Sequence, residues 1–438
     1  MFVNLFVIMM LVITQISGTI STFPSFYTTT SRAYEKLKGQ ESSSDKDVSM
    51  RIRSYEQDDI VVLSVTYSQS KASRDVNRLR FVSEKALEPP SSSESRKDKI
   101  MFLFGEHARE FVSVEAALRL SSVLIGDDES EELNELGREV LEKYDVVSIP
   151  VANPMGRQKA ENGEFCYRDN ANGVDLNRNW DAHWDASLND GNTNSGSGPF
   201  SEPETKILRD VMTETSPHIF MTVHSGTLGM YTPFAYSTSV PTGPEESEML
   251  SMILPLDEKY CQCPMGAAGK EVGYLCPGTC LDYAYDVLNV PFAFAFEIYG
   301  DENERRKCKE EFERQKMRFQ EKESYMNDVV SFLQVETEAL HSCFLQNRVE
   351  TSTKHLSRMS DEECFAFFNP TSKEELDEVT KNWVGVFLKL ALKVSEVSSS
   401  SGTTKTTVVS DVRSSTSTSI STTVDKEMGL KIVGSKIV

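Results

Sequence analysis

Several short segments of this chain combine side chains that could hydrolyse a bond, and the stretch FLFGEHAREF at residues 102–111 is the densest. Within it, His107 and Glu110 lie three positions apart, so one turn of helix would place both on the same face. Imidazole and carboxylate groups are common protein ligands of zinc. Surface helices contain His-x-x-Glu pairs by chance, so this pair indicates a metal site only if further ligands exist elsewhere.

Two other apolar runs stop at a reactive side chain. The run HIFMTV is followed by His224, and the run PFAFAF is followed by Glu297. A catalytic zinc ion takes three protein ligands and keeps one position open, and His107, Glu110 and His224 would supply the three. Hydrolysis also needs a carboxylate that removes a proton from the attacking water, for which Glu297 is the candidate. A structural ion pair with a buried Arg is the alternative role for Glu297.

The segment CYRDNANGVDLNRNW, residues 166–180, adds cationic and amide groups. Its Arg168, Asn177 and Arg178 lie beside aromatic and glycine residues. A guanidinium binds a carboxylate through two parallel hydrogen bonds, and it can also hold an oxyanion that develops in the transition state. The alternative is a polar loop packed by its aromatic side chains.

These groups need elements to position them, and the chain alternates apolar runs with runs of helical periodicity. Strands are expected at 51–57, 59–68, 100–104, 146–151, 218–223 and 291–296, and helices at 112–125, 202–212 and 281–288. This alternation predicts an α/β fold, a mainly parallel mixed sheet flanked by helices on both faces. Such sheets bind ligands beyond the carboxyl ends of their strands, and three of the expected strands lead into the reactive residues.

The composition is that of an acidic globular protein. Of its 438 residues, 39% are apolar and 26% are charged, with a formal net charge of −21. These values predict a large core and argue against nucleic acid and anionic membranes as partners. We expect a monomer without stable membrane insertion.

The N-terminal residues 1–19 are expected to form a signal peptide. Their apolar core, residues 5–13, is too short to span a bilayer, and small residues follow it. The positively charged n-region of a typical signal peptide is absent, because the first Lys or Arg is Arg32. A buried N-terminal helix is the alternative for this segment. A signal peptide predicts a protein that is secreted or retained in the endomembrane lumen.

Eight cysteines favour disulfides in such a compartment. Four of them, Cys261, Cys263, Cys276 and Cys280, fall close together, and a Cys₄ zinc site is the alternative for these four. Cys166 is expected in a structural disulfide, with a redox-sensitive control point near Arg168 as the alternative.

The C-terminal part differs in character from the rest. Residues 301–395 are charged and helical in pattern, and residues 396–438 form a Ser/Thr-rich tail that contains too few apolar side chains to fold. We therefore expect a catalytic domain at 23–395, with its core at 100–300, and a disordered tail that is a candidate O-glycosylated stalk.

The motifs, taken together and in order, resemble the zinc carboxypeptidase family, which includes pancreatic carboxypeptidases A and B. The matching segments are GEHAREF, NPMG, YRDN, GVDLNRNWD, GPFSEPET, VHS, GTCLDYAYD and FAFEIYG. They span residues 105–300, somewhat under half of the chain. Any one segment is a weak indication, but the ordered set is specific.

The resemblance implies a catalytic centre with one zinc ion. His107, Glu110 and His224 match the zinc ligands of the family. Glu297 matches the general base, which later returns the proton to the leaving amine. Arg168 matches the Arg that polarises the scissile carbonyl and steadies the oxyanion.

The resemblance also implies a site for the C-terminus of a peptide or protein substrate. Asn177 and Arg178 match the pair that grips the terminal carboxylate, and Tyr274 matches the Tyr that closes over the bound residue. Arg109 matches a residue of the substrate groove. Leu281 matches the floor of the specificity pocket, where a Leu favours apolar or aromatic C-terminal residues.

The chain also departs from the family pattern. Gly226 stands where the digestive branch usually carries Tyr, and the residues before the core are too few for the digestive prodomain. Asp282, in contrast, matches a structural Asp of the family behind the pocket. Two other functions stay open: a zinc-dependent deacylase or amidase on the same core, and an inactive relative that binds peptides.

Overall fold

The computed structural model describes residues 22–43, 48–55, 60–67, 97–188, 193–242, 244–300 and 359–402. The expected signal peptide at 1–19, most of the charged segment at 301–358 and the tail beyond 402 lie outside these residues. One compact unit spans 1–396, and of the second unit, 397–438, only residues 397–402 are described. They continue the last helix, so this helix extends beyond the boundary that we expected at 395.

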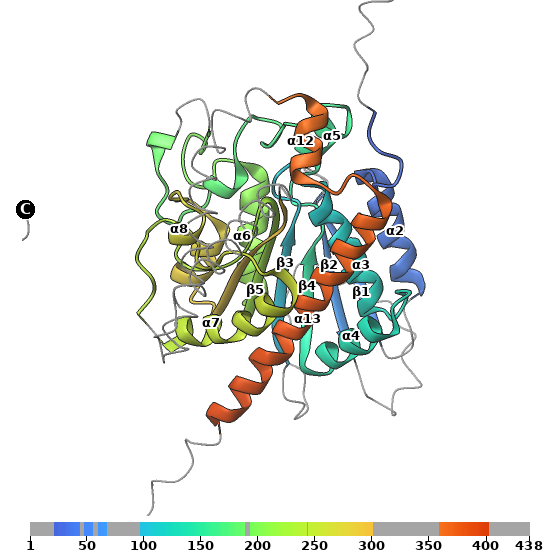
Figure 1. Ribbon diagram of the computed structural model, residues 1–438, viewed down its shortest axis with the longest axis vertical. Coiled ribbons are helices and arrows are strands. Elements are labelled where there is room, and N and C mark those ends of the chain that lie inside the picture. The colour runs from blue at the N-terminus through green and yellow to red at the C-terminus, as the bar shows by residue number, and fades with distance from the viewer. Residues whose placement is uncertain are drawn as a thin grey trace, which may run out of the picture. The chain divides into compact units, whose positions relative to one another are not determined.

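A mixed sheet of seven strands runs through the compact unit (Figure 1). Its strands are β1 (Val48–Tyr55), β2 (Ile60–Tyr67), β3 (Asp98–Phe104), β4 (Tyr144–Ile149), β5 (Ile219–Thr232), β6 (Met265–Ala267) and β7 (Phe292–Gly300). The order is β1-β2-β4-β3-β5-β6, and β7 also pairs with β5. The first two strands pair antiparallel, as β2 does with β4, whereas the other pairs are parallel. The predicted fold class is confirmed.

Helices and short turns connect these strands. The helices are α2 (Thr30–Ser43), α3 (Phe111–Leu124), α4 (Glu131–Lys143), α5 (Pro154–Glu161), α6 (Pro203–Thr215), α7 (Pro244–Leu256), α8 (Ala268–Glu271), α9 (Cys280–Asp282), α12 (Asp361–Phe368) and α13 (Lys373–Gly402). The single turns are η1 (Leu176–Arg178), η2 (Ala186–Leu188), η3 (Asp257–Cys261) and η4 (Tyr283–Val287).

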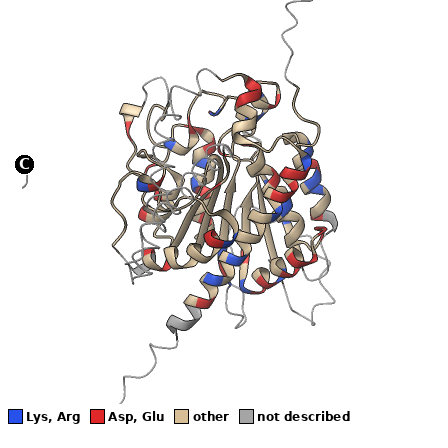
Figure 2. Ribbon diagram, in the orientation of Figure 1, with Lys and Arg blue, Asp and Glu red and all other residues tan. Residues whose placement is uncertain are grey.

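Different hydrophobic clusters cover the two faces of the sheet. Alternate residues of a strand point to opposite faces, so Met101 and Leu103 pack with Leu208 of α6 in one cluster. On the other face, Phe102 and Phe104 contact Phe387 of α13. In Figure 2 the central strands are almost free of charged residues, which gather on the flanking helices. The sheet is therefore buried on both sides.

Two strands are longer than expected. We predicted that they end before His224 and Glu297, but β5 and β7 continue through these residues. Their pairing becomes irregular directly after His224, where several register shifts occur. Such irregularities bend a strand and aim side chains locally. The reactive side chains are thus held within strands, where their backbone is already hydrogen-bonded.

Candidate metal centre and active site

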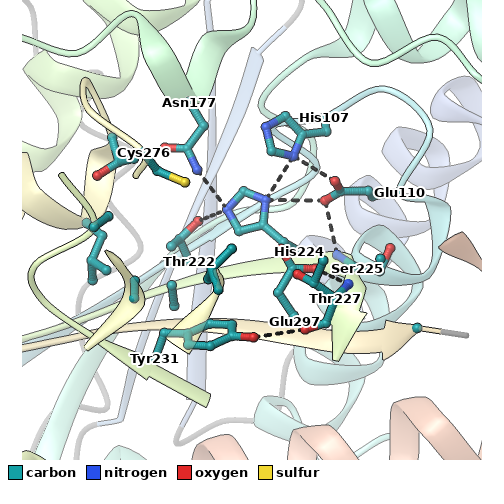
Figure 3. A pocket seen from close by; sticks show the side chains of 18 of the residues that line it. His107, Glu110, Asn177, Thr222, His224, Ser225, Thr227, Tyr231, Cys276 and Glu297 are labelled. Atoms are coloured by element: carbon teal, nitrogen blue, oxygen red, sulfur yellow. Dashed lines mark hydrogen bonds and ion pairs between the residues drawn. The ribbon is translucent and has the colours of Figure 1, made fainter. Parts of the chain in front are cut away.

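All of the predicted site residues line one pocket, which lies beyond the end of β3 and beside β5 and β7 (Figure 3). They are His107, Arg109, Glu110, Arg168, Asn177, Arg178, His224, Tyr274, Leu281 and Glu297.

The predicted metal ligands converge on one point. Nδ1 of His107 lies 2.7 Å from Oε1 of Glu110, and Nδ1 of His224 lies 3.2 Å from Oε2 of the same carboxylate. The two Nδ1 atoms are 3.1 Å apart. Tetrahedral zinc with bonds of about 2.0–2.1 Å separates its ligands by about 3.3 Å, so this spacing fits the ion. His107, Glu110 and His224 also form a group that could hold a metal.

The outer ring nitrogen of each histidine has polar neighbours at hydrogen-bond distance. Nε2 of His107 lies 3.2 Å from Oδ1 of Asp175, and Nε2 of His224 lies 2.8 Å from Oγ1 of Thr222 and 3.3 Å from Nδ2 of Asn177. With an ion bound at the shared point and protons on the outer nitrogens, both Nδ1 atoms would present lone pairs to the ion. This donor chemistry fits zinc.

Glu110 is electrostatically suited to stay ionised. Burial alone would raise its pKa, but the neighbouring His107 and His224 hold the pKa of this carboxyl well below its ordinary value. The backbone amide of Ser225 also donates to Oε2 at 3.1 Å. A permanently ionised carboxylate is what a cation needs as a ligand.

A turn, rather than a helix, brings His107 and Glu110 together. We expected both on one face of a helix, but α3 begins only at Phe111. The backbone amide of Glu110 donates to the carbonyl of His107 at 3.3 Å. Gly105 starts this turn with a φ of +66°, where an added Cβ would meet Val114 at 2.9 Å. Only glycine suits this conformation and space.

Glu297 lies beside the candidate metal centre because of strand register. It is the β-sheet partner of His224, and the amide of Thr227 donates to its Oε2 at 3.3 Å. Burial, together with the charge of Glu110, raises the pKa of Glu297 above its ordinary value. Among the described residues no Arg or Lys forms an ion pair with it, so the alternative of a structural pair is not seen there.

Asp175 is a site residue to which the sequence analysis gave no role. Its Oδ2 accepts from Nε of Arg168 at 2.8 Å, while its Oδ1 accepts from the amide of Asn177 at 3.0 Å. Burial opposes ionisation, but Arg168 and Arg178 hold the pKa of Asp175 well below its ordinary value. Its place in GVDLNRNW, next to the predicted Asn177 and Arg178, was the available signal.

The other end of the pocket is built on the turn before α9. The backbone amide of Cys280 donates to Oδ1 of Asn177 at 3.0 Å. The side chain of Arg178 is held by a hydrogen bond from its Nη1 to the backbone carbonyl of Asn177 at 2.7 Å. Tyr274 is 45% exposed at the rim. Leu281 is buried and shares this part of the lining with alanines and a valine.

Asp282 lies behind this end, as the resemblance implied. Its carboxyl group accepts from the amides of Ala235 and Tyr236 at 2.9 to 3.1 Å. It does not line the pocket. Burial raises the pKa of Asp282 to about 6, although these amides oppose the shift.

The cysteines follow the disulfide prediction in part. Cys166 pairs with Cys364, and Cys261 pairs with Cys263. The Cys₄ zinc alternative is wrong, because two of its members form a disulfide with each other. Cys276 and Cys280 are free and buried, and Cys276 lines the pocket, which the sequence analysis did not anticipate.

The helices and turns described by the structure include none that is long and apolar enough to cross a bilayer.

Comparison with known proteins agrees with this geometry. A family model described as zinc carboxypeptidase matches residues 39–331. Mouse carboxypeptidase A2 is 27% identical over 258 residues, which cover 54% of this chain and 57% of the relative. Carboxypeptidase B of Helicoverpa zea is 27% identical over 238 residues, which cover 47% of this chain and 52% of the relative. An inactive metallocarboxypeptidase of Arthroderma otae is 26% identical over 268 residues, with coverages of 51% and 44%.

Solved structures support the fold. Thrombin activatable fibrinolysis inhibitor superposes with a TM-score of 0.55 at 17% identity, covering 86% of this chain and 78% of that chain. The chain spans about half the length of the curated relatives it matches. Since the family model covers more than half of the chain, this protein belongs to the zinc carboxypeptidase family.

Proposed function

We propose that this protein is a zinc-dependent carboxypeptidase that removes the C-terminal residue of peptides and proteins. One observation carries the proposal: a set of His107, Glu110 and His224 with metal-ligand spacing lies beside Glu297, in the same pocket as Arg178. Family membership makes a hydrolase the expected class, and secretion as a monomer is proposed on the sequence alone.

Each reactive side chain has a task that its surroundings suit. A zinc ion held by His107, Glu110 and His224 would act as a Lewis acid and make water nucleophilic near neutral pH. Glu297 would take the proton of the attacking water and deliver it to the leaving amine. Arg168 would donate hydrogen bonds to the oxygen of the scissile carbonyl as negative charge develops there.

Recognition of a free C-terminus rests on the opposite end of the pocket. Arg178 and Asn177 would bind the terminal carboxylate, because a guanidinium and an amide supply convergent N–H donors. Tyr274, exposed at the rim, would close over the bound residue. Leu281 lies in an apolar part of the lining, which favours apolar or aromatic terminal side chains. Arg109 would contact the peptide further along the groove.

The two alternatives have less support. An inactive family member is among the relatives, so family membership alone does not establish activity. In this chain, however, the three candidate ligand residues, Glu297, Arg168 and Arg178 are present together in the pocket. A deacylase or amidase would not need Asn177 and Arg178 to bind a terminal carboxylate of the substrate.

The test is release of the last residue from blocked dipeptides that end in Phe, Leu, Arg, Lys or Glu. We expect release that requires zinc and a free terminal carboxylate, fastest for Phe or Leu. Glu297→Gln is the matched control, because it keeps the shape but cannot take a proton, and we expect about 10³-fold or greater loss of kcat. A folded, zinc-loaded protein that releases nothing would contradict the proposal.

A further inference from the structure

A second group of potential metal ligands lies on the far side of His224 from Glu110. Glu106, His224 and Cys280 are all buried, and one ligand atom of each lies within 4.8 Å of the others. We call this group the outer site. Neither Glu106 nor Cys280 has a role in the function proposed above, so their convergence on a candidate zinc ligand needs an explanation.

The two ring nitrogens of His224 face different groups. Nδ1 points to the first candidate metal site, whereas Nε2 points to Thr222 and Asn177 on the opposite side of the ring (Figure 3). Oε2 of Glu106 lies 3.6 Å from Nε2. The outer site therefore takes the nitrogen that the first candidate metal site leaves unused.

The distances within the outer site suit a tetrahedral ion with one sulfur ligand. Sγ of Cys280 lies 3.5 Å from Oε2 of Glu106, and Nε2 of His224 lies 3.6 Å from the same oxygen. A tetrahedral zinc ion separates a sulfur and an oxygen ligand by about 3.6 Å, and a nitrogen and an oxygen ligand by about 3.4 Å. Oγ1 of Thr222, 2.8 Å from Nε2, offers an oxygen for a fourth position.

The carboxylate of Glu106 is buried without a Lys or Arg that could balance its charge. It is 1% exposed, and in the part of the chain that the structure describes its ion-pair partner is His224. Its Oε1 accepts from Nε1 of Trp180 at 2.9 Å, which orients the group and leaves Oε2 for the outer site. An ionised carboxylate in such a place is costly unless it is paired or binds a metal, and a cation in the outer site would supply the missing charge.

We propose that the outer site binds a second transition-metal ion, with zinc as the expected occupant, and that His224 bridges the two ions as an imidazolate. Thiolate and imidazole ligands favour zinc over magnesium or calcium. Binding would release two protons to solvent, one from the thiol of Cys280 and one from Nε2 of His224.

The neighbours of Nε2 suit a nitrogen without a proton. Oδ1 of Asn177 accepts from the backbone amide of Cys280, which directs the N–H groups of the same side chain towards His224. Nδ2 of Asn177 lies 3.3 Å from Nε2, and an amide N–H can only donate there. The hydroxyl of Thr222 can either donate or accept.

The second ion would have a structural role. Glu106 belongs to the turn that carries His107, and Cys280 begins α9. The third ligand, His224, lies within β5, so one ion would fasten three separate segments. Neither Glu106 nor Cys280 lines the pocket, so the outer site is closed to a substrate.

The test is loading of the full chain with cobalt(II), which replaces zinc and reports its ligands in the absorption spectrum. The ligands of the first candidate site include no sulfur, so a sulfur-to-cobalt charge-transfer band in the near ultraviolet would come from a cysteine elsewhere. For the wild type we expect this band and a second cobalt ion per chain by elemental analysis. A single ion without the band would overturn the inference and leave the proposed function intact.

Cys280→Ser removes the sulfur and keeps a similar size. The matched control is Cys276→Ser, because Cys276 is also free and buried but does not belong to the outer site. We expect Cys280→Ser to lose the band and the second ion, and Cys276→Ser to keep both. A band that survives Cys280→Ser, or that disappears with Cys276→Ser, would assign the sulfur to another cysteine and overturn the inference.

Glu106→Gln is a second variant that keeps the shape of the side chain and its acceptor for Trp180. It should weaken binding of the second ion by at least about tenfold, measured by competition with a chelator. Unchanged affinity would mean that Cys280 merely donates a hydrogen bond to Glu106, which overturns the inference. Absence of peptidase activity in a protein that holds both ions would contradict the proposed function alone.

Discussion

Single residues of the pocket are paired with buried partners that fix their protonation state. Asp175 receives hydrogen bonds from His107 and Arg168, and so orients one proposed metal ligand and the proposed oxyanion donor together. The pKa of a buried carboxyl group depends on its surroundings, since burial raises it and neighbouring cations lower it. Asp282 shows the opposite balance, because burial dominates there and raises its pKa to about 6.

The raised pKa of Asp282 predicts a pH dependence of stability. An unfolded Asp titrates near about 3.9, so between about pH 4 and 6 the folded protein binds more protons at this position than the unfolded chain. The contribution of Asp282 to the free energy of unfolding is therefore present at low pH and falls as the pH rises through this window. The expected loss is about 3 kcal/mol.

Denaturant unfolding of the wild type and Asp282→Asn, from pH 4 to pH 7, measures this contribution. The Asn side chain does not titrate, so the difference between the two proteins isolates Asp282. We expect the wild type to lose stability relative to the variant as the pH rises. A constant difference, or one that grows in favour of the wild type, would show that Asp282 is ionised throughout.

At the scale of elements, one face of strand β7 packs against helix α13, and the opposite face lines the pocket. Phe296 and Phe387 meet on one face of β7, whereas Ala295 and Glu297 face the pocket on the other. The alternation of side chains along a strand produces this division. Substitutions in α13 should therefore change stability more than they change the site.

Phe387→Ala tests this separation. Phe387 is fully buried and contacts Phe102, Phe104 and Phe296. Its truncation should lower the free energy of unfolding by about 3–5 kcal/mol. The folded fraction should keep its zinc affinity, measured by titration. Lys381→Ala, at an exposed position of the same helix, should change stability by less than about 0.5 kcal/mol, and an equal effect of both would contradict this account.

At the scale of the whole molecule, the two disulfides found among the described residues close loops of very different length. Cys166–Cys364 joins residues 198 positions apart, whereas Cys261–Cys263 joins residues 2 positions apart. A cross-link stabilises by restricting the unfolded chain, and the restriction grows with loop length. The long link also fastens α12 to the segment that carries Arg168.

Replacement of each pair by serine compares the two links. Cys166→Ser with Cys364→Ser should lower the free energy of unfolding by about 2–5 kcal/mol, and Cys261→Ser with Cys263→Ser by clearly less. Unfolding in guanidinium chloride under non-reducing conditions gives both values. If the short pair proved the more important one, local packing rather than chain restriction would govern stability.

Much of the fold and site followed from local sequence. The apolar runs and their periods predict the central strands and the helices α3 and α6, because burial on both faces and helical amphipathicity leave direct patterns. The candidate metal ligands and Glu297 stand out for a similar reason. Their types and positions beside apolar runs are costly unless they serve a site.

Other features depend on contacts that local sequence does not encode. The turn that pairs His107 with Glu110, the register that sets His224 beside Glu297, and the continuation of both strands are decided by tertiary hydrogen bonds. Asp175 becomes a partner of His107 only because the chain folds back there. The fit of Phe368 against Gly226 joins residues distant in sequence. The sequence determined which groups are present, and long-range packing decided which of them meet.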